Sequence, residues 1–164
     1  MNTSAPGGDR DQAAANSGTY IHATALAIGE AGILIRGPSG AGKSRLALEL
    51  IAEASRRGLF AQLVGDDRVA LDSRAGRLVA RGHPAIAGQI ESRGEGILHV
   101  AYERATVIRL VLDMGGEAGT PARLPQPDTR SLLGGVSLPQ LRLDGPTQDQ
   151  ARLVISHLLR LRNG

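Results

Sequence analysis

The sequence predicts an α/β fold in which helices flank a mixed sheet. Three observations lead to this prediction: several short apolar runs of strand length, two amphipathic stretches of helix length, and a glycine-rich loop that joins a predicted strand to a predicted helix. A chain of 164 residues is long enough for one domain with its own core.

The N-terminal part is expected to be a tail followed by a strand hairpin. Residues 1–18 are small and polar and are predicted to be a disordered tail, so the domain is expected to span 19–164. Apolar runs at 21–28 and 33–35 predict two strands, and the residues between them, Gly-Glu-Ala-Gly, predict a turn.

The rest of the domain is expected to alternate between strands, loops and two helices. Further strands are predicted at 59–64, 69–71, 78–80, 97–100, 107–112 and 138–143. Helices are predicted at Ser44–Arg57, before Gly58, and from a capping box at Thr147 to Leu161. Residues 82–96 are expected to be irregular and 114–136 to form a long, partly mobile loop.

The composition argues against several classes of function. There is no cysteine, which excludes disulfides and thiolate metal sites, and no apolar stretch of membrane-span length. Because the first residues also lack a secretory signal pattern, we expect a cytoplasmic protein without membrane attachment. One Phe, two Tyr and scattered arginines disfavour nucleic-acid binding, despite a net charge of +3.

The loop GPSGAGKS has the full P-loop pattern, G-x-x-x-x-G-K-[ST], between a predicted strand and a predicted helix. Its glycines allow successive backbone N–H groups to turn toward phosphate. Lys43 is the only lysine among 19 Lys and Arg residues, and its compact ammonium group suits a site between phosphates. The residues predicted to bind a nucleoside triphosphate are Gly37, Pro38, Ser39, Gly40, Ala41, Gly42, Lys43 and Ser44, the last also through Mg²⁺.

Asp66 and Asp67 directly follow the predicted strand at 59–64, at the sheet edge where ligands bind in open α/β folds. One carboxylate can hold Mg²⁺ and the other can take the proton of an attacking hydroxyl, and the spacing leaves open which does which. Adjacent strand residues point to opposite sides, so we expect the two to have different roles unless the chain bends there. Taken alone, His22, Glu91 and Arg93 are ordinary surface or turn residues.

Four segments, in this order, resemble one bacterial enzyme family. They are IHA at 21–23, GPSGAGKS at 37–44, VGDDRV at 64–69 and ESRGEGIL at 91–98. Together they resemble the catalytic domain of HPr kinase/phosphorylase over about Tyr20–Leu112. The short chain resembles the truncated alphaproteobacterial form, without the N-terminal domain of full-length members.

This resemblance implies the fold shared by HPr kinase and PEP carboxykinase, ATP and Mg²⁺ as cofactors, and phosphorylation of a serine of the carrier protein HPr by a hexamer. It implies catalytic roles for His22, Lys43, Asp67 and Arg123, and magnesium coordination by Ser44 and Glu91. In this family Asp67 matches the residue that accepts the serine proton and returns one in the reverse reaction.

Two departures from the family pattern leave other functions open. Pro38 stands where the family usually has Asp, and Leu138–Leu141 stands where the family has a Pro-Gly-Arg-Asn loop tied to phosphorolysis. Kinase activity is therefore the expected reaction, with the reverse reaction open. A regulatory module that binds nucleotide without kinase activity, and a small-molecule kinase or ATPase with Arg123 and Arg130 in its lid, are the alternatives.

Overall fold

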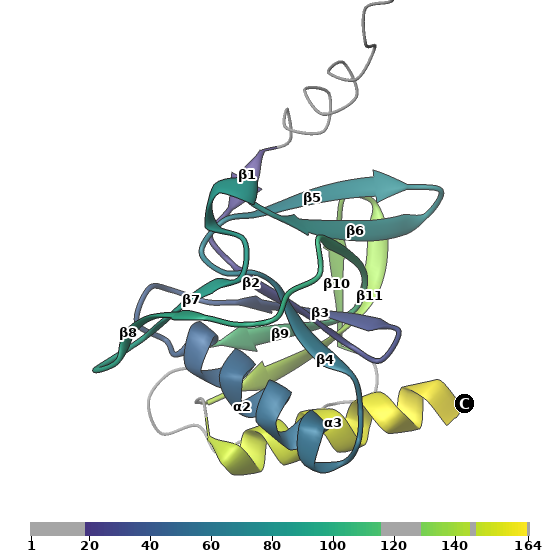
Figure 1. The fold of residues 1–164 in the computed structure, drawn as a ribbon. Coiled ribbons are helices and arrows are strands. Elements are labelled where there is room, and N and C mark those ends of the chain that lie inside the picture. Colours follow the sequence, from purple (N-terminus) through teal and green to yellow (C-terminus); the bar gives the residue numbers. More distant parts are fainter. Residues whose placement is uncertain (1–18, 116–128, 145–146, 164) are drawn as a thin grey trace, which may run out of the picture.

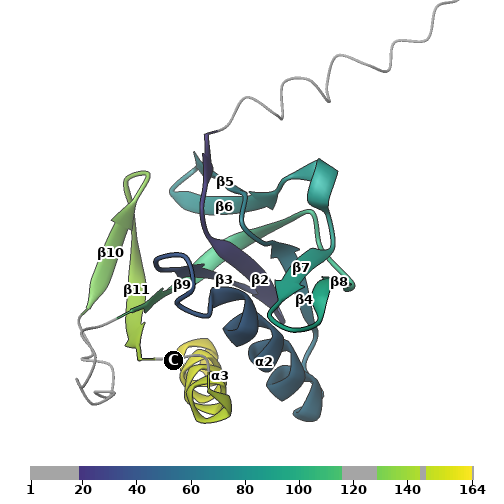
Figure 2. The same ribbon diagram turned by 90° about the vertical axis from the view of Figure 1, so that its left-hand side faces the viewer.

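The structure, a computed structural model, describes residues 19–115, 129–144 and 147–163. In this part of the chain a curled sheet of nine strands is accompanied by a two-stranded ribbon, and two helices lie side by side on one face (Figures 1 and 2). The strands are β1 (Tyr20–Ile21), β2 (Thr24–Ile28), β3 (Ala31–Arg36), β4 (Ala61–Gly65), β5 (Val69–Arg74), β6 (Arg77–Gly82), β7 (Gln89–Ser92), β8 (Gly96–His99), β9 (Ala105–Met114), β10 (Arg130–Leu133) and β11 (Val136–Leu143). The helices are α2 (Lys43–Arg56) and α3 (Gln148–Asn163), with a 3₁₀ turn, η2 (Pro84–Ile86).

The predicted α/β fold with helices flanking a mixed sheet is confirmed, and two segments need correction. The stretch 82–96, expected to be irregular, contains η2 and β7. The stretch 114–136, expected to be a loop, contains β10, and its residues 116–128 lie outside the described residues. The predicted tail at 1–18 also lies outside them.

The sheet is organised around β9, which pairs with strands on both sides. On one side it runs parallel to β3, and on the other its two halves pair with β6, antiparallel, and β11, parallel. The order continues from β3 through β2 to β4. The carboxyl ends of β3, β9 and β11 therefore lie together at one edge, from which the loop GPSGAGKS leaves β3.

Two apolar layers cover the two faces of the sheet, because successive side chains of a strand alternate between faces. In β3, Ile33 and Ile35 pack toward the helices and Leu34 packs toward the other side. The helix-side layer is completed by Leu46, Leu50, Val154 and Ile155. On the opposite side the sheet curls so tightly that a Cβ on Gly82 would lie 2.2 Å from the Val64 carbonyl oxygen, so only glycine fits there.

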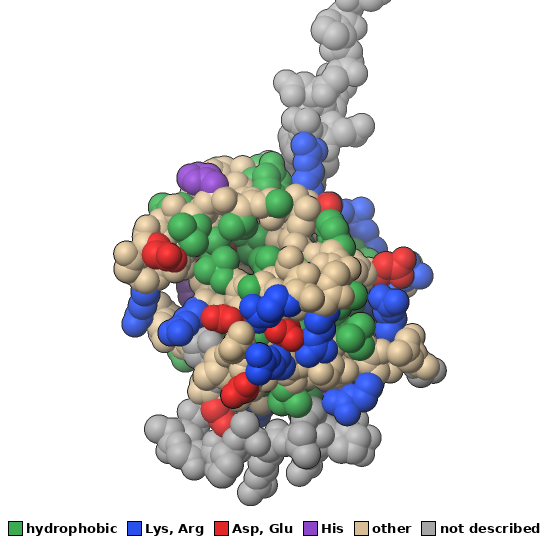
Figure 3. Space-filling model, turned by 60° about the horizontal axis from the view of Figure 1, so that its bottom comes forward, with side chains coloured by type: hydrophobic (Ala, Val, Ile, Leu, Met, Phe, Trp, Pro, Cys, Tyr) green, Lys and Arg blue, Asp and Glu red, His purple; other side chains and the backbone are tan. Residues whose placement is uncertain are grey.

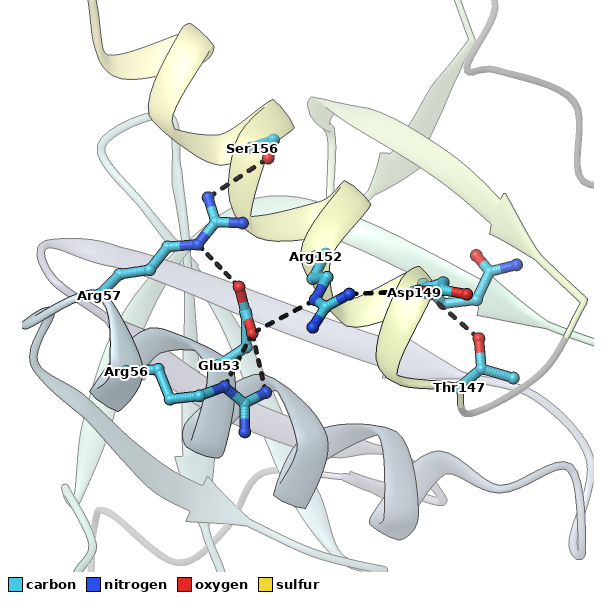
Figure 4. Close-up of polar contacts among 8 residues, drawn as sticks. Glu53, Arg56, Arg57, Thr147, Asp149, Arg152 and Ser156 are labelled. Atoms are coloured by element: carbon cyan, nitrogen blue, oxygen red, sulfur yellow. Dashed lines mark hydrogen bonds and ion pairs between the residues drawn. The ribbon is translucent and has the colours of Figure 1, made fainter.

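The seam between α2 and α3 is closed by charged side chains. Figure 3 shows basic and acidic side chains intermixed on the helix-bearing side of the molecule. At the seam the Glu53 carboxylate accepts hydrogen bonds from Arg56 and Arg57 and lies 3.9 Å from Arg152 of α3 (Figure 4). Arg57 also donates to Ser156, at 3.3 Å, so this cluster ties the two helices together.

The start of α3 agrees in part with the predicted capping box. The Gln150 backbone N–H donates to Thr147 Oγ1 at 3.2 Å. The Gln150 side-chain oxygen is buried and has no hydrogen-bond partner among the described residues, so the reciprocal bond is not formed.

Neither this helix nor any other in the described part is long and apolar enough to span a membrane.

Candidate functional site

The loop from Gly37 to Ser44 leaves β3 and turns directly into α2. Its turn is closed by a backbone bond from the Ala41 N–H to the Pro38 carbonyl, at 3.1 Å. Gly40 and Gly42 have φ angles of 82° and 95°, values that side chains disfavour. Gly42 caps α2 without a side chain, so the first N–H groups of the helix are available to an anion.

Lys43 is the first residue of α2 and is buried, with 7% of its surface exposed. Its Nζ donates to the carbonyl oxygens of Gly37, at 2.8 Å, and Pro38, at 3.1 Å. Burial lowers the pKa of Lys43 below its usual 10.5, and the nearby charges of Asp66 and Asp67 act in the opposite direction. The loop thus folds around an ammonium group held by backbone oxygens.

Asp66 follows β4 and points into the site, where it is 8% exposed. Both of its carboxylate oxygens lie 2.9 Å from Ser44 Oγ. Asp66 also accepts hydrogen bonds from Thr24 Oγ1, at 2.7 Å, and from the backbone N–H of Glu91, at 3.4 Å. All of these donors are uncharged, and none of the described Lys or Arg side chains forms a salt bridge with this carboxylate.

Asp67 points the other way and is exposed. Its backbone has a φ of 67°, a left-handed conformation that is uncommon for a residue with a side chain. Its Oδ1 lies 2.6 Å from Nδ1 of His22, and both side chains are more than half exposed. The chain bends at Asp67, so the strand alternation used in the sequence analysis does not apply here, but the two adjacent carboxylates still have different surroundings.

The ribbon of β7 and β8 forms the opposite wall of the site. It carries Glu91 and Arg93, and its turn is closed by a hydrogen bond of 2.8 Å between Ser92 and Glu95. Arg93 reaches toward the phosphate loop, because its Nη2 lies 3.2 Å from where a Cβ on Gly40 would stand. The ribbon therefore brings a cation and a carboxylate over the loop.

These segments enclose one cleft of about 860 Å³. Residues predicted for the site that line it are His22, Ser39, Gly40, Ala41, Gly42, Lys43, Ser44, Asp67 and Glu91. Gly37 and Pro38 lie at the base of the loop and contact the Lys43 ammonium through their carbonyls. Arg123 lies outside the described residues.

The donor set fits magnesium better than a transition metal. Among the described residues there is no cluster of three or more His, Asp or Glu side chains positioned to hold a metal. Mg²⁺ usually takes one or two carboxylates and completes its shell with water and substrate phosphate oxygens. Ser44 and Asp66, with Glu91 across the cleft, supply such a partial set of hard oxygen donors.

Sequence reasoning left three features of the site unassigned. It did not decide which aspartate faces Ser44, it gave no role to Thr24, and it treated Arg93 as a solvated turn residue. The hydroxyl of Thr24 lies at the start of β2, next to the His22 segment, but only the pairing of strands brings it to Asp66.

Comparisons with known proteins point to one family. The family model described as HPr Serine kinase C-terminal domain matches residues 13–143. The chain is 40% identical over 79 residues to the HPr kinase/phosphorylase of Mycoplasma mycoides, and 40% identical over 93 residues to that of Clostridium beijerinckii. These matches span 48% and 56% of the chain but only 23% and 29% of the two relatives.

A solved structure extends the likeness over most of the fold. It is that of the Hpr(Ser) kinase/phosphatase from Coxiella burnetii, with a TM-score of 0.69 and 26% sequence identity. The match covers 88% of this chain and 99% of that one. The curled mixed sheet and its flanking helices are therefore shared with that structure.

Proposed function

The chain belongs to the family of the HPr serine kinase C-terminal domain, and from this premise we propose that it transfers the γ-phosphate of ATP to a serine of an HPr-type phosphocarrier protein. One observation carries the proposal: a phosphate loop with its lysine, a Ser44–Asp66 pair and an exposed Asp67–His22 pair converge on one cleft. Phosphoryl transfer depends mainly on positioning and charge stabilisation, which these groups supply.

In this proposal Asp67 is the general base. It accepts the proton of the acceptor serine as the serine oxygen bonds to the γ-phosphorus and the bond to the β-phosphate oxygen breaks, releasing ADP. Nδ1 of His22, 2.6 Å away, holds one oxygen of Asp67 and leaves the other for the hydroxyl. The exposure of this pair suits an acceptor as large as a protein.

Lys43 and the loop amides bind the β- and γ-phosphates, and Arg93 adds positive charge near the γ-phosphate. A catalytic role for Arg123 is proposed from the family resemblance alone. Ser44 and Asp66, with Glu91, would hold Mg²⁺. When bound, this ion would offset charge on the phosphate oxygens. The proposal extends to a cytoplasmic homo-oligomer, a hexamer by resemblance, with no nucleic acid or membrane involved. It also includes phosphorolysis of the phosphoserine, in which inorganic phosphate attacks the phosphorus, the bond to the serine oxygen breaks, and pyrophosphate and the serine hydroxyl are released.

The test is transfer of label from γ-labelled ATP to purified HPr with magnesium. We expect a labelled serine, loss of transfer in Lys43→Ala, and loss of transfer with retained ATP binding in Asp67→Ala. Labelled HPr that persists in Asp67→Ala rules out the base assignment. Wild-type protein that binds ATP without labelling HPr points to a regulatory module, and a labelled metabolite points to a small-molecule kinase.

A further inference from the structure

The strand ends beneath the phosphate loop are joined by a side-chain network that the proposed chemistry does not use. Arg36, the last residue of β3, donates to both oxygens of Asp113 in β9, from Nε at 2.7 Å and from Nη2 at 2.8 Å. Gln140 of β11 donates to the same carboxylate. One carboxylate therefore links the last residue of β3, the end of β9 and the middle of β11, three strands that run parallel.

This network sits where the chain leaves the sheet for the loop. Arg36 and Asp113 face each other as the last pair of the β3–β9 ladder, and Gly37 begins the loop. A two-point contact between a guanidinium and a carboxylate fixes direction as well as distance. The two hydrogen bonds from Arg36 to Asp113 therefore join the last residue pair of the β3–β9 ladder. Beyond this pair, strand pairing no longer holds the loop in place.

Beyond the network, the end of β9 is in direct contact with the loop. A Cβ added to Gly37 would lie 2.6 Å from the Met114 carbonyl oxygen, so the two backbones touch. A Cβ on Gly115 would lie 3.2 Å from Cδ of Pro38. The first two residues of the loop are thus packed against the two residues that follow Asp113.

The same two loop residues hold the lysine. The carbonyls of Gly37 and Pro38 accept the hydrogen bonds of the Lys43 ammonium. A continuous set of contacts therefore runs from Asp113, through the end of β9 and the base of the loop, to the Nζ atom.

We propose that Arg36, Asp113 and Gln140 form a positioning network that sets the location of the Lys43 ammonium for nucleotide binding. The inference rests on the nucleotide-binding part of the proposed function. Arg36 is itself unsuited to bind phosphate, because Nε and Nη2 are engaged by Asp113 in a neutral pair that is about three-quarters buried. Its effect on nucleotide is therefore exerted through the loop.

The experiment measures the Kd for ATP with magnesium by calorimetry in wild type, Asp113→Asn and Arg36→Lys. An amide has a single acceptor oxygen and turns its NH₂ group toward a donor, so Asp113→Asn breaks the network. Arg36→Lys keeps the positive charge but loses the two-point contact with the carboxylate. We expect both variants to bind ATP about tenfold more weakly, equal to about 1.4 kcal/mol. The double variant Arg36→Lys with Asp113→Asn is expected to be no weaker than either single one, because both break the same unit.

The matched control is Glu53→Gln, which breaks a buried arginine–carboxylate cluster at the seam of the two helices, near the opposite end of α2 from the loop. We expect this variant to lower the Tm and to leave the Kd within about twofold. Asp113→Asn that binds ATP like wild type overturns the inference, as does Glu53→Gln that weakens binding equally. Wild type that binds no ATP overturns the proposed function, and the inference falls with it.

Discussion

Asp66 and Glu53 are both buried carboxylates, with 8% and 5% of their surfaces exposed, but their surroundings differ. Glu53 is bound by two arginines and lies near a third. Asp66 accepts only from hydroxyl and backbone N–H groups, and none of the described Lys or Arg residues forms a salt bridge with it.

The two surroundings suit different roles for a buried acid. A charge enclosed by cations is already compensated, and it holds structure together. A carboxylate that accepts hydrogen bonds only from neutral groups has no cation bound to it directly, although the Lys43 ammonium is near enough to interact with Asp66. In this protein the first arrangement joins two helices, and the second adjoins the Ser44 hydroxyl and the phosphate loop.

The largest expected effect comes from removing the charge of Asp66. In Asp66→Asn the hydroxyls of Thr24 and Ser44 can rotate to suit the amide, so the fold keeps its hydrogen bonds. The attraction for a divalent cation is lost, and we expect transfer to HPr to fall on the order of a thousandfold. The measurement is the labelling rate over a magnesium titration, with the Tm recorded in parallel.

Two results bear on this prediction. If excess magnesium restores part of the rate in Asp66→Asn, a weakened cation site is supported. A variant that transfers phosphate at the wild-type rate at low magnesium contradicts the assignment of Asp66 and removes the contrast with Glu53.

The second-largest effect is expected for Glu53→Gln, which should lower the stability of the fold without lowering the rate of phosphate transfer. Glu53→Gln leaves three arginines crowded at the seam between α2 and α3 without their carboxylate. We expect the Tm to fall by several degrees, because unpaired charges are left partly buried, while the transfer rate measured well below the Tm stays within about twofold. Calorimetry and the labelling assay check the two halves.

The control for this prediction is Asp72→Asn, which breaks the exposed pair with Arg74 on β5. Exposed pairs contribute little, so its Tm is expected to remain close to that of wild type. Equal Tm losses in Asp72→Asn and Glu53→Gln would show that burial of the seam does not matter.

The sequence predicted the parts of the site that have local signals. The P-loop pattern located the loop that folds around Lys43, and the aspartate pair after a strand was expected at the same edge of the sheet, where both residues line the cleft. Which aspartate faces inward depends on the positive φ of Asp67, a backbone feature with no signal in the residue type.

The features that could not be predicted depend on contacts between distant segments. β7 and β10 lie in stretches whose glycines and prolines indicated loops, and their pairing with β8 and β11 overrides that local preference. The Arg36–Asp113–Gln140 network joins residues 77 and 27 positions apart, which only the parallel pairing around β9 brings together. Glu53 and Arg152 are also distant in sequence, and only the packing of α2 against α3 brings them together.

The smallest expected effect is a pH dependence that distinguishes the seam from the site. Hydrogen bonds from Arg56 and Arg57 lower the pKa of Glu53 below its usual 4.5. A carboxylate whose pKa is lower in the folded state stabilises the protein above its unfolded-state pKa, and this contribution is lost as the pH falls through the folded-state value. The difference in Tm between wild type and Glu53→Gln should therefore be full at neutral pH and shrink below about pH 4.5.

Scanning calorimetry of the two proteins over the same acidic series checks this, because the other titrating groups are common to both and cancel in the difference. Asp72→Asn, run alongside, is expected to show a small difference at every pH, because the exposed pair contributes little. A gap between wild type and Glu53→Gln that stayed constant far below the lowered pKa would mean that packing rather than charge holds the seam. In that case the charge of Glu53 would not be what stabilises the seam, and the contrast with Asp66 could not be explained by charge.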